Sequence, residues 1–410
     1  MNNSFARAAL FALCLGLGVA YSQEKGESIR PEVGKPLQAA QDLLKAHKPR
    51  DALAKVREAD AIAGKTPYES YVIERMRAAA AAGAGDVAEA IKSFEAVIAS
   101  GRLPQAELLT MTQALAGSYY RSKDYPKAIA WAARYYKEGG TDPQLRLLLI
   151  HSYYQNNEFA EAAQEAMADI EADEKSGIAP PEDRLQLLAN CYLKLNDANR
   201  YLWALEKLVG YYPKKEYWAD LIARTQRKTT FADRLALDMF RLKYATDNLA
   251  VSEDYMEMAQ LALQAGYPAE SRKVLELGFR NGVLGKGADA DRHKRMQSLA
   301  EKQFADDQRA LAKGDVEAAA LAEKDGIALV NLGYAYVTDG QFEKGLALME
   351  RGIAKGVTDA KRPQDAKLHL GVAYFMAGKK EKALEIFSTV SGIHGAADMG
   401  RLWSLRARQS

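Results

Sequence analysis

Small and apolar residues recur along the chain at a spacing that suits packed pairs of helices. Ala52, Ala90, Ala128 and Ala162 each follow a small or apolar residue by twelve positions and an aromatic or apolar residue by nine. A small residue on each of two helices lets their axes approach closely, and the larger residue fills the volume beside them. Turn-forming segments such as residues 83–86 separate the two helices of a pair. The pattern therefore predicts a succession of helix pairs.

Two copies of this pattern near the C-terminus are the most regular. Their apolar, small, aromatic, small and large apolar positions are occupied by Leu332, Gly333, Tyr336, Gly345 and Met349, and then by Leu370, Gly371, Tyr374, Ala383 and Phe387. At these positions the chain resembles the tetratricopeptide repeat (TPR) family. The resemblance implies an all-α fold, a right-handed α-solenoid of roughly nine or ten TPR-like helix pairs, because one pair alone cannot bury its apolar face.

The regularity of the pattern varies along the chain and predicts its organisation. A polar leader at 23–30 precedes a TPR-like superhelix at 31–280, and residues 327–394 predict two further repeats. Between them, residues 281–326 interrupt the pattern, and we expect an irregular region or hinge there, with a highly charged helix followed by one short second helix. The register is also ambiguous between Trp218 and Tyr244, where either Arg234 or Ala236 could take the small position.

The final segment, residues 395–410, predicts a helix with one apolar face. The apolar residues are Met399, Leu402, Trp403 and Leu405, whereas Arg401, Arg406 and Arg408 are expected to point outward. A stack of repeats leaves its last apolar face exposed unless something covers it, so we interpret this helix as a C-terminal cap. A helix that binds a partner or a membrane surface is the alternative.

The first residues of the chain have the composition of a secretory signal peptide. Arg7 precedes an apolar run at 8–20, and Ala20 and Ser22 are small residues at the positions that signal peptidases require, so residues 1–22 are expected to be removed by cleavage after Ser22. The alternatives are a membrane anchor or a buried first helix, but the run is too short to span a bilayer. The apolar residue before Cys14 disfavours a lipid anchor. We expect a periplasmic protein.

Cleavage would leave Cys191 as the one remaining cysteine, which excludes an intramolecular disulfide. Cys191 lies in an apolar run of an expected first helix. We therefore expect a buried and inert thiol rather than a catalytic or redox-active one.

Sequence motifs for catalysis, cofactors and nucleic acids are missing. The five histidines, His47, His151, His293, His369 and His394, do not have the spacing of metal ligands, and no cysteine pairs accompany them. Residues 280–287 lack the first glycine and the Ser or Thr of a phosphate loop, and no nucleophile elbow occurs. The 56 basic and 54 acidic residues are interspersed, which disfavours nucleic-acid binding. We expect no cofactor, no metal and no enzymatic activity.

The TPR resemblance also implies a binding surface, because the first helix of each pair lines a concave groove in that family. Carried over to this sequence, the groove-facing residues are Gln113, Tyr120, Arg121, His151, Tyr154, Gln155, Gln186, Asn190, Lys194, Tyr334 and Phe375. The first nine offer aromatic, amide and positively charged groups that suit an extended peptide with some acidic character. A register shift of one residue would exchange Tyr120 and Tyr154 with Tyr119 and Tyr153, and the former would then only pack between helices.

These features together predict a non-enzymatic periplasmic scaffold that binds another protein or an extended peptide. The exported, repeat-filled architecture resembles TPR proteins that accompany cell-envelope machineries, including the TonB, ExbB and ExbD type, although no motif selects one machinery. Peptidoglycan or outer-membrane assembly machinery is equally compatible. The alternative is a periplasmic small-ligand-binding or enzyme-accessory protein, with residues 281–326 forming the pocket. An enzyme hidden by the helical architecture is a third possibility, but no convergent set of catalytic residues supports it.

Overall fold

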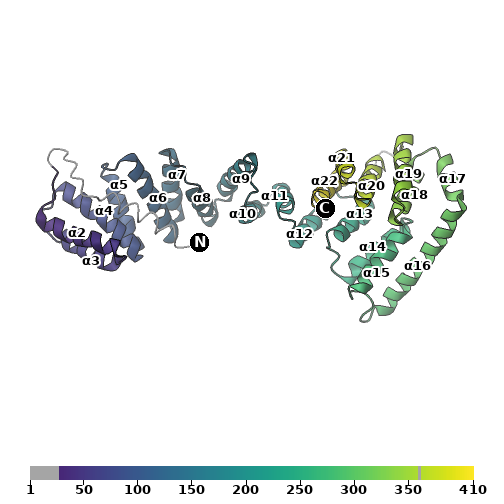
Figure 1. Ribbon diagram of the computed structural model, residues 1–410, viewed down its shortest axis with the longest axis horizontal. Helices are drawn as coiled ribbons and strands as arrows, with labels where there is room; N and C mark the ends of the chain where they lie inside the picture. Colours follow the sequence, from purple (N-terminus) through teal and green to yellow (C-terminus); the bar gives the residue numbers. More distant parts are fainter. Residues whose placement is uncertain (1–26, 359–361) are drawn as a thin grey trace. The chain divides into compact units, whose positions relative to one another are not determined.

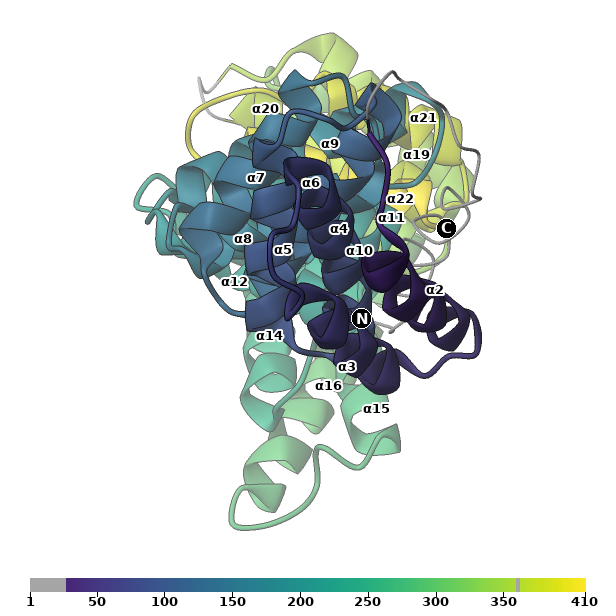
Figure 2. The same cartoon turned by 90° about the vertical axis from the view of Figure 1, so that its left-hand side faces the viewer.

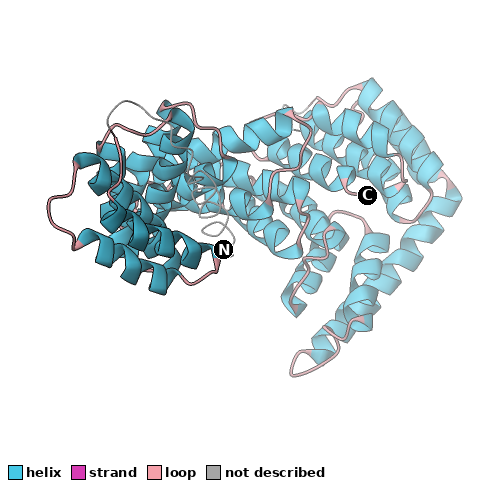
Figure 3. Ribbon diagram, turned by 60° about the vertical axis from the view of Figure 1, so that its left-hand side comes forward, coloured by secondary structure: helices cyan, strands magenta, loops and turns pink. Residues whose placement is uncertain are grey.

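The computed structural model describes residues 27–358 and 362–410. Over these residues it contains 21 α-helices, one short 3₁₀ helix and no β-strand (Figure 1). Figure 3 shows the same helices joined by loops alone. The predicted all-α fold of stacked helix pairs is therefore confirmed. The predicted signal peptide at residues 1–22 lies outside the described residues.

The chain divides into two compact units that share helix α10 (Glu182–Lys194). Among the described residues, the first unit comprises 27–178 together with 190–197, and the second comprises 179–189, 198–358 and 362–410. In the first unit, four helix pairs precede α10: α2 (Pro31–Lys45) with α3 (Pro49–Asp60), α4 (Pro67–Ala84) with α5 (Val87–Ala99), α6 (Gln105–Arg121) with α7 (Tyr125–Lys137), and α8 (Pro143–Gln155) with α9 (Phe159–Lys175).

The helices of the second unit are less uniform in length. They are α11 (Ala198–Tyr211), α12 (Lys215–Gln226), the 3₁₀ helix η1 (Asp233–Leu235), α13 (Ala236–Ala245), α14 (Ser252–Gln264), α15 (Pro268–Arg280), α16 (Ala290–Lys313), α17 (Asp315–Ala322), α18 (Ile327–Thr338), α19 (Phe342–Lys355), α20 (Arg362–Met376), α21 (Lys380–Ser388) and α22 (Ala396–Arg408). The ambiguous register near Trp218 corresponds to η1 and the short α13.

The segment at 281–326 contains the two helices that its sequence predicts. The long helix is α16, and the short one is α17, which has 8 residues. Helix α16 packs beside α14 and α15 (Figure 2), and α17 packs against α16 and α18. Packing thus continues through this segment, and the division into compact units lies at α10. The predicted hinge at 281–326 stays a prediction.

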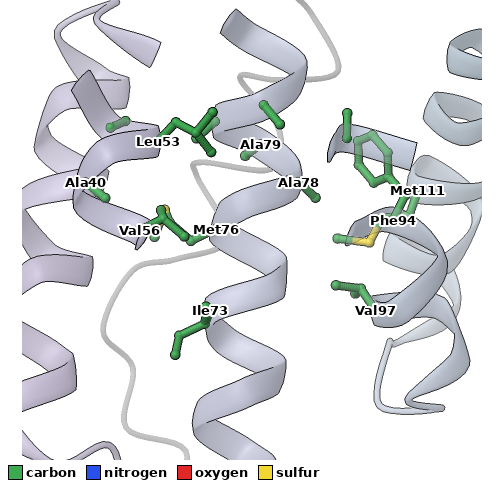
Figure 4. Close-up of a cluster of buried hydrophobic side chains, with 14 of the residues drawn as sticks. Ala40, Leu53, Val56, Ile73, Met76, Ala78, Ala79, Phe94, Val97 and Met111 are labelled. Atoms are coloured by element: carbon green, nitrogen blue, oxygen red, sulfur yellow. The ribbon is translucent and has the colours of Figure 1, made fainter. Parts of the chain in front are cut away.

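The core of the first unit has small residues where helices cross and larger residues between them. Ala78 on α4 and Ala90 on α5 lie twelve positions apart, and both are almost completely buried. Val56, Ile73 and Phe94 fill the neighbouring volume (Figure 4). The small residues at the spacing that the sequence shows are thus buried in the core, as a close approach of the two helices of a pair requires.

Helix α4 begins at a buried carboxylate that joins two segments of the first unit. The hydroxyl of Thr66 accepts a hydrogen bond from the backbone N–H of Glu69, and the Glu69 side chain accepts one from the N–H of Thr66. Glu69 is fully buried, and its two oxygens also accept from the guanidinium and the backbone N–H of Arg30. The bonds from Arg30, then from Thr66, hold the pKa of Glu69 at about 2.

Replacing Glu69 with glutamine is therefore expected to destabilise the first unit in a pH-dependent way. A carboxylate whose pKa is lower in the folded state stabilises the fold above its unfolded pKa, and this contribution is lost as the pH falls through the folded value. The Glu69→Gln variant should melt several degrees below wild type at pH 7, and the gap should narrow between pH 4.5 and 2. Thermal unfolding followed by circular dichroism measures the difference in melting temperature between the variant and wild type at each pH. The exposed Glu58→Gln is the matched control, and a gap independent of pH would contradict the role of the Glu69 charge.

Helices α18 and α19 cross at two glycines that face each other. A Cβ atom added to Gly333 would lie 2.5 Å from the carbonyl oxygen of Gly345, and one added to Gly345 would lie 2.5 Å from the carbonyl oxygen of Gly333. Each backbone therefore occupies the space that a side chain on the other helix would need. This crossing has no room for alanine, which the equivalent positions of α4 and α5 contain.

Helix α22 packs against its own chain on more than one side. It lies against α20 and α21, where a cap would lie, and it also contacts α11 and α13 (Figure 1). Its residues Met399, Leu402 and Trp403 are buried. The sequence predicted that Arg406 points outward, but the Arg406 guanidinium lies 5.4 Å from the Phe375 ring, and its Nε donates to the carbonyl oxygen of Ala245 at 2.8 Å. The contact with α13 is the reason for this difference.

The thiol of Cys191 is fully buried on α10. Burial raises its pKa to about 12, so the reactive thiolate is negligible at neutral pH. The predicted burial of Cys191 is confirmed, and its inertness stays a prediction.

Candidate partner-binding surface

Helix α6 presents Tyr119 and Tyr120 to different environments. Tyr119 is buried, and its hydroxyl donates to the carboxylate of Glu95 on α5. Tyr120 is half-buried at the edge of the core, and its ring meets the Tyr125 ring edge-on with a centroid distance of 5.8 Å. The structure thus supports the register in which Tyr119 packs between helices and Tyr120 remains partly open to solvent.

The next helix pair repeats this arrangement. The ring of Tyr154 on α8 meets the ring of Phe159, the first residue of α9, edge-on at 5.4 Å. Tyr153 packs against the core cluster that includes Leu145 and Leu149. Tyr125 is likewise the first residue of its helix, α7, so Tyr120 and Tyr154 occupy equivalent places in successive pairs. Helices α6 and α8 are in contact, which places the two aromatic pairs on neighbouring repeats.

Arg121 adds a positive charge beside Tyr120. The residue as a whole is exposed, but its guanidinium is partly buried, and Nη2 donates to the hydroxyl of Ser118 at 2.9 Å. No carboxylate pairs with Arg121 in the described part of the chain, and partial burial lowers its pKa because no negative charge compensates the lost solvation. A guanidinium that is partly desolvated and has no paired carboxylate is stabilised by a charge-assisted hydrogen bond to an acidic group of another molecule.

The side-chain amides of Gln113 and Gln186 form hydrogen bonds within the protein. Nε2 of Gln113 donates to the carboxylate of Asp142, which also accepts from the backbone N–H of Gln144 and so caps α8. The Nε2 group of Gln186 donates to the hydroxyl of Tyr217 in the second unit. These amides hold neighbouring helices in place, and we expect them to contribute to stability more than to partner binding.

The remaining predicted residues of these pairs differ in exposure. His151 and Tyr154 are half-buried, whereas Gln155, Asn190 and Lys194 are exposed. Asn190 and Lys194 belong to the part of α10 that lies in the first unit. The structure therefore brings the predicted residues of α6 and α8 onto adjacent helices, and these two helices form the candidate partner-binding face.

Tyr334 and Phe375 do not lie on an open groove, and the prediction for them is wrong. Tyr334 is fully buried, and Phe375 is half-buried under α22, with its ring 5.4 Å from that of Trp403. In the second unit, α13 and α22 pack near the positions that would face a groove, so these aromatic residues contact the protein itself.

The sequence analysis missed a buried charged cluster in the second unit. The guanidinium of Arg241 donates to both oxygens of Glu270 and to one oxygen of Asp238, each at 2.8 Å. It also lies 4.4 Å from the ring of Tyr334 and 5.2 Å from that of Tyr267, within cation–π range. Only the apolar neighbours of Arg241 in the sequence could have indicated its burial.

Asp238 connects this cluster to a distant helix. Its carboxylate lies 3.0 Å from Nε2 of His369 on α20. Burial alone would raise the pKa of Asp238, but His369 and then Arg241 outweigh burial and hold it at about 2. The cluster therefore joins charged side chains on α13 and α15 to His369 on α20, and each charge depends on its partners.

The second unit also contains two hollows. One, of about 390 Å³, is lined by α14 and by Asp289, Arg292 and His293, so the predicted pocket region at 281–326 forms only part of its wall. The other, of about 170 Å³, lies elsewhere, between α13, α14, α15, α18, α20 and α22. Among the described residues, no group of three or more potential ligands is arranged to hold a metal ion. No helix in the same residues combines the length and apolarity needed to cross a membrane.

Comparison with known proteins gives two kinds of match. Residues 75–144 and 330–392 match a family model described as a tetratricopeptide repeat. Comparison with curated proteins finds no match. Among solved structures, the chain is similar to the TPR2AB domain of yeast Sti1 in complex with pHSP90, with 12% identity, a TM-score of 0.24 and coverage of 74% of this chain and 100% of that chain. It is also similar to yeast Tom70, with 11% identity, a TM-score of 0.24 and coverage of 92% and 94%.

Proposed function

We propose that this chain, two segments of which match the tetratricopeptide repeat model, is an exported scaffold whose first unit binds another protein. The partner contacts the candidate face on α6 and α8 through an extended segment. The repeat fold itself supports a role in protein–protein interaction, since stacked helix pairs expose a long continuous surface.

The repeated aromatic pairs on α6 and α8 are the observation that carries this proposal. Tyr120 with Tyr125 and Tyr154 with Phe159 hold half-buried rings at equivalent places in two adjacent repeats. A ring fixed by an edge contact loses little conformational freedom when a partner covers it, which makes it an efficient anchor. The regular offset between repeats suits a segment that runs along successive pairs.

The charge beside these rings indicates the chemistry of the segment. Arg121 has no carboxylate partner within the described residues, and Lys194 is exposed on α10. An acidic segment would supply the missing negative charge through charge-assisted hydrogen bonds. We therefore propose an extended and acidic binding partner.

Export and the cellular setting belong to the same proposal. The apolar run at 8–20 and the small residues Ala20 and Ser22 support cleavage of a signal peptide and a periplasmic location. We propose that the scaffold serves a cell-envelope machinery, for which a system of the TonB, ExbB and ExbD type is one example. Small-ligand binding is the second candidate function, and the 170 Å³ cavity of the second unit favours it.

Reversing the two charges is expected to weaken partner binding without unfolding the protein. The variant Arg121→Glu with Lys194→Glu should recover at least tenfold less of the protein that co-purifies with wild type from a periplasmic extract, because like charges would face an acidic segment. Quantitative pull-down measures the loss of the partner. The same preparation tests export, because the wild-type chain that it recovers should begin at Gln23.

The matched control is Lys302→Glu with Arg309→Glu, which makes the same change in net charge on exposed positions of α16. Both variants should keep the wild-type melting temperature. Equal recovery of the partner with both variants would reject the α6–α8 face, and a chain recovered only from the cytoplasm with residues 1–22 intact would reject export.

A further inference from the structure

The 170 Å³ cavity of the second unit has mainly apolar walls. Its apolar lining residues include Met258, Val274, Val372, Phe375 and Met376. A cavity of about this volume accommodates a group the size of a benzene ring. The helices that form it are far apart in the sequence, since α13, α14, α15, α18, α20 and α22 all contribute.

Three hydrogen-bond donors in the lining are not matched by a carboxylate. Nζ of Lys273 donates to the carbonyl oxygen of Thr338, and Nε of Arg406 donates to that of Ala245. Neither cation forms an ion pair in the described residues. The indole Nε1 of Trp403 is buried and has no hydrogen-bond partner there, which is unfavourable unless another molecule supplies an acceptor.

The acidic group in the lining is already neutralised. Both oxygens of Glu270 accept from Arg241, which Asp238 also contacts, so this cluster carries one net negative charge. Lys273 and Arg406 carry two positive charges, and the lining is left with excess positive charge and unused donors. Burial lowers the pKa of Arg406, because no carboxylate offsets its desolvation.

We propose that this cavity binds a small apolar monocarboxylate, such as an arylacetate or a branched-chain fatty acid of about six carbons. The carboxylate lies among Lys273, Arg406 and the Trp403 indole, which supply charged and neutral donors to its two oxygens. The apolar part lies against the methionine, valine and phenylalanine side chains. This inference uses no residue of the α6–α8 face and is independent of the proposed partner binding.

Binding has a structural consequence that can be measured. A ligand in the cavity contacts α15, α20 and α22 at once, and it therefore favours the packed arrangement of helices that are distant in sequence. Because the unfolded chain has no such site, saturating ligand raises the melting temperature of the second unit.

The test compares acids with their neutral amides on the full-length mature chain. Phenylacetate and 4-methylpentanoate are titrated by calorimetry and in thermal unfolding, and phenylacetamide and 4-methylpentanamide are the controls of equal size. The acids are expected to raise the melting temperature and to bind at least tenfold more tightly than the amides. Equal binding of acid and amide, or no shift with either acid, would overturn the proposal. Tighter binding of a peptide ending in phenylalanine than of phenylacetate would overturn it in favour of a peptide C-terminus.

Variants of the lining residues test which side chains donate to the carboxylate of the ligand. Arg406→Gln and Lys273→Gln are each expected to weaken phenylacetate binding at least tenfold while binding of phenylacetamide changes little. Arg408→Gln, on an exposed position of the same helix, is the matched control and should bind like wild type. If Arg406→Gln does not fold, Lys273→Gln and the comparison of acid with amide in wild type still show whether the cavity binds a carboxylate. Unchanged acid binding in Lys273→Gln or in a folded Arg406→Gln would contradict the assignment.

Discussion

Replacing Arg241 with leucine is expected to lower the free energy of unfolding of the second unit by about 3–5 kcal/mol, the usual loss when one partner of a buried ionic group is removed. The change leaves Glu270 and Asp238 buried without the guanidinium that donates to both at 2.8 Å. It also removes the cation that lies within cation–π range of the rings of Tyr334 and Tyr267. Urea unfolding followed by tryptophan fluorescence measures the loss.

Two further measurements separate charge from packing in this cluster. The second change Glu270→Gln in the Arg241→Leu background should recover part of the loss, because an amide is less unfavourable than an unpaired buried carboxylate. Asp238, with its pKa held at about 2, stabilises the fold above pH 4, and this contribution is lost as the pH falls through 2. The difference between wild type and Arg241→Leu should therefore narrow in acid.

The exposed pair of Arg309 and Asp306 provides the matched control. Because both side chains are largely solvated, Arg309→Leu should change the free energy of unfolding by less than about 0.5 kcal/mol. A loss below about 1 kcal/mol for Arg241→Leu would show that water or rearranged side chains replace the guanidinium, and the cluster would then not organise the second unit.

Replacing Gly345 with alanine is expected to destabilise the second unit by about 2–3 kcal/mol, although alanine normally favours helices. The new methyl group would lie 2.5 Å from the carbonyl oxygen of Gly333 and 2.7 Å from Cγ2 of Val337. The obstructing atom is part of the backbone, so α18 and α19 must move apart to admit it. Thermal and urea unfolding measure the loss.

Gly210 on α11 is the matched control for this substitution. A Cβ atom there would meet only the flexible Leu405 side chain, at an ordinary distance of 3.7 Å. Gly210→Ala should therefore be neutral or stabilising by up to about 1 kcal/mol, because alanine restricts the unfolded chain and favours the helix. Destabilisation by both changes to the same extent would argue against a close approach specific to α18 and α19.

Much of the helical architecture could be predicted because local sequence controls it. The start of α18 at Ile327, the long charged helix after residue 289 and the short α17 all follow from periodicity, turn residues and the distance between small positions. Export stays a prediction, because residues 1–22 lie outside the described residues.

The candidate site could be predicted only in part. The spacing correctly distinguished the buried Tyr119 from the half-open Tyr120, because both positions are defined within one helix pair. The same spacing failed for Tyr334, which meets the requirements of its own pair but is buried by helices from other parts of the chain. No local pattern records which distant helix will cover a given face.

The sequence by itself determined the all-α class, the helix pairs and their close crossings, because small residues at a fixed spacing impose these features within about forty residues. The tertiary structure alone decided that α22 contacts α11 and α13, that Arg241 meets Glu270 and Asp238, and that Lys273, Arg406 and Trp403 line one cavity. These contacts join residues separated by up to about two hundred positions. They depend on how complete pairs pack together, which the period of a single repeat does not encode.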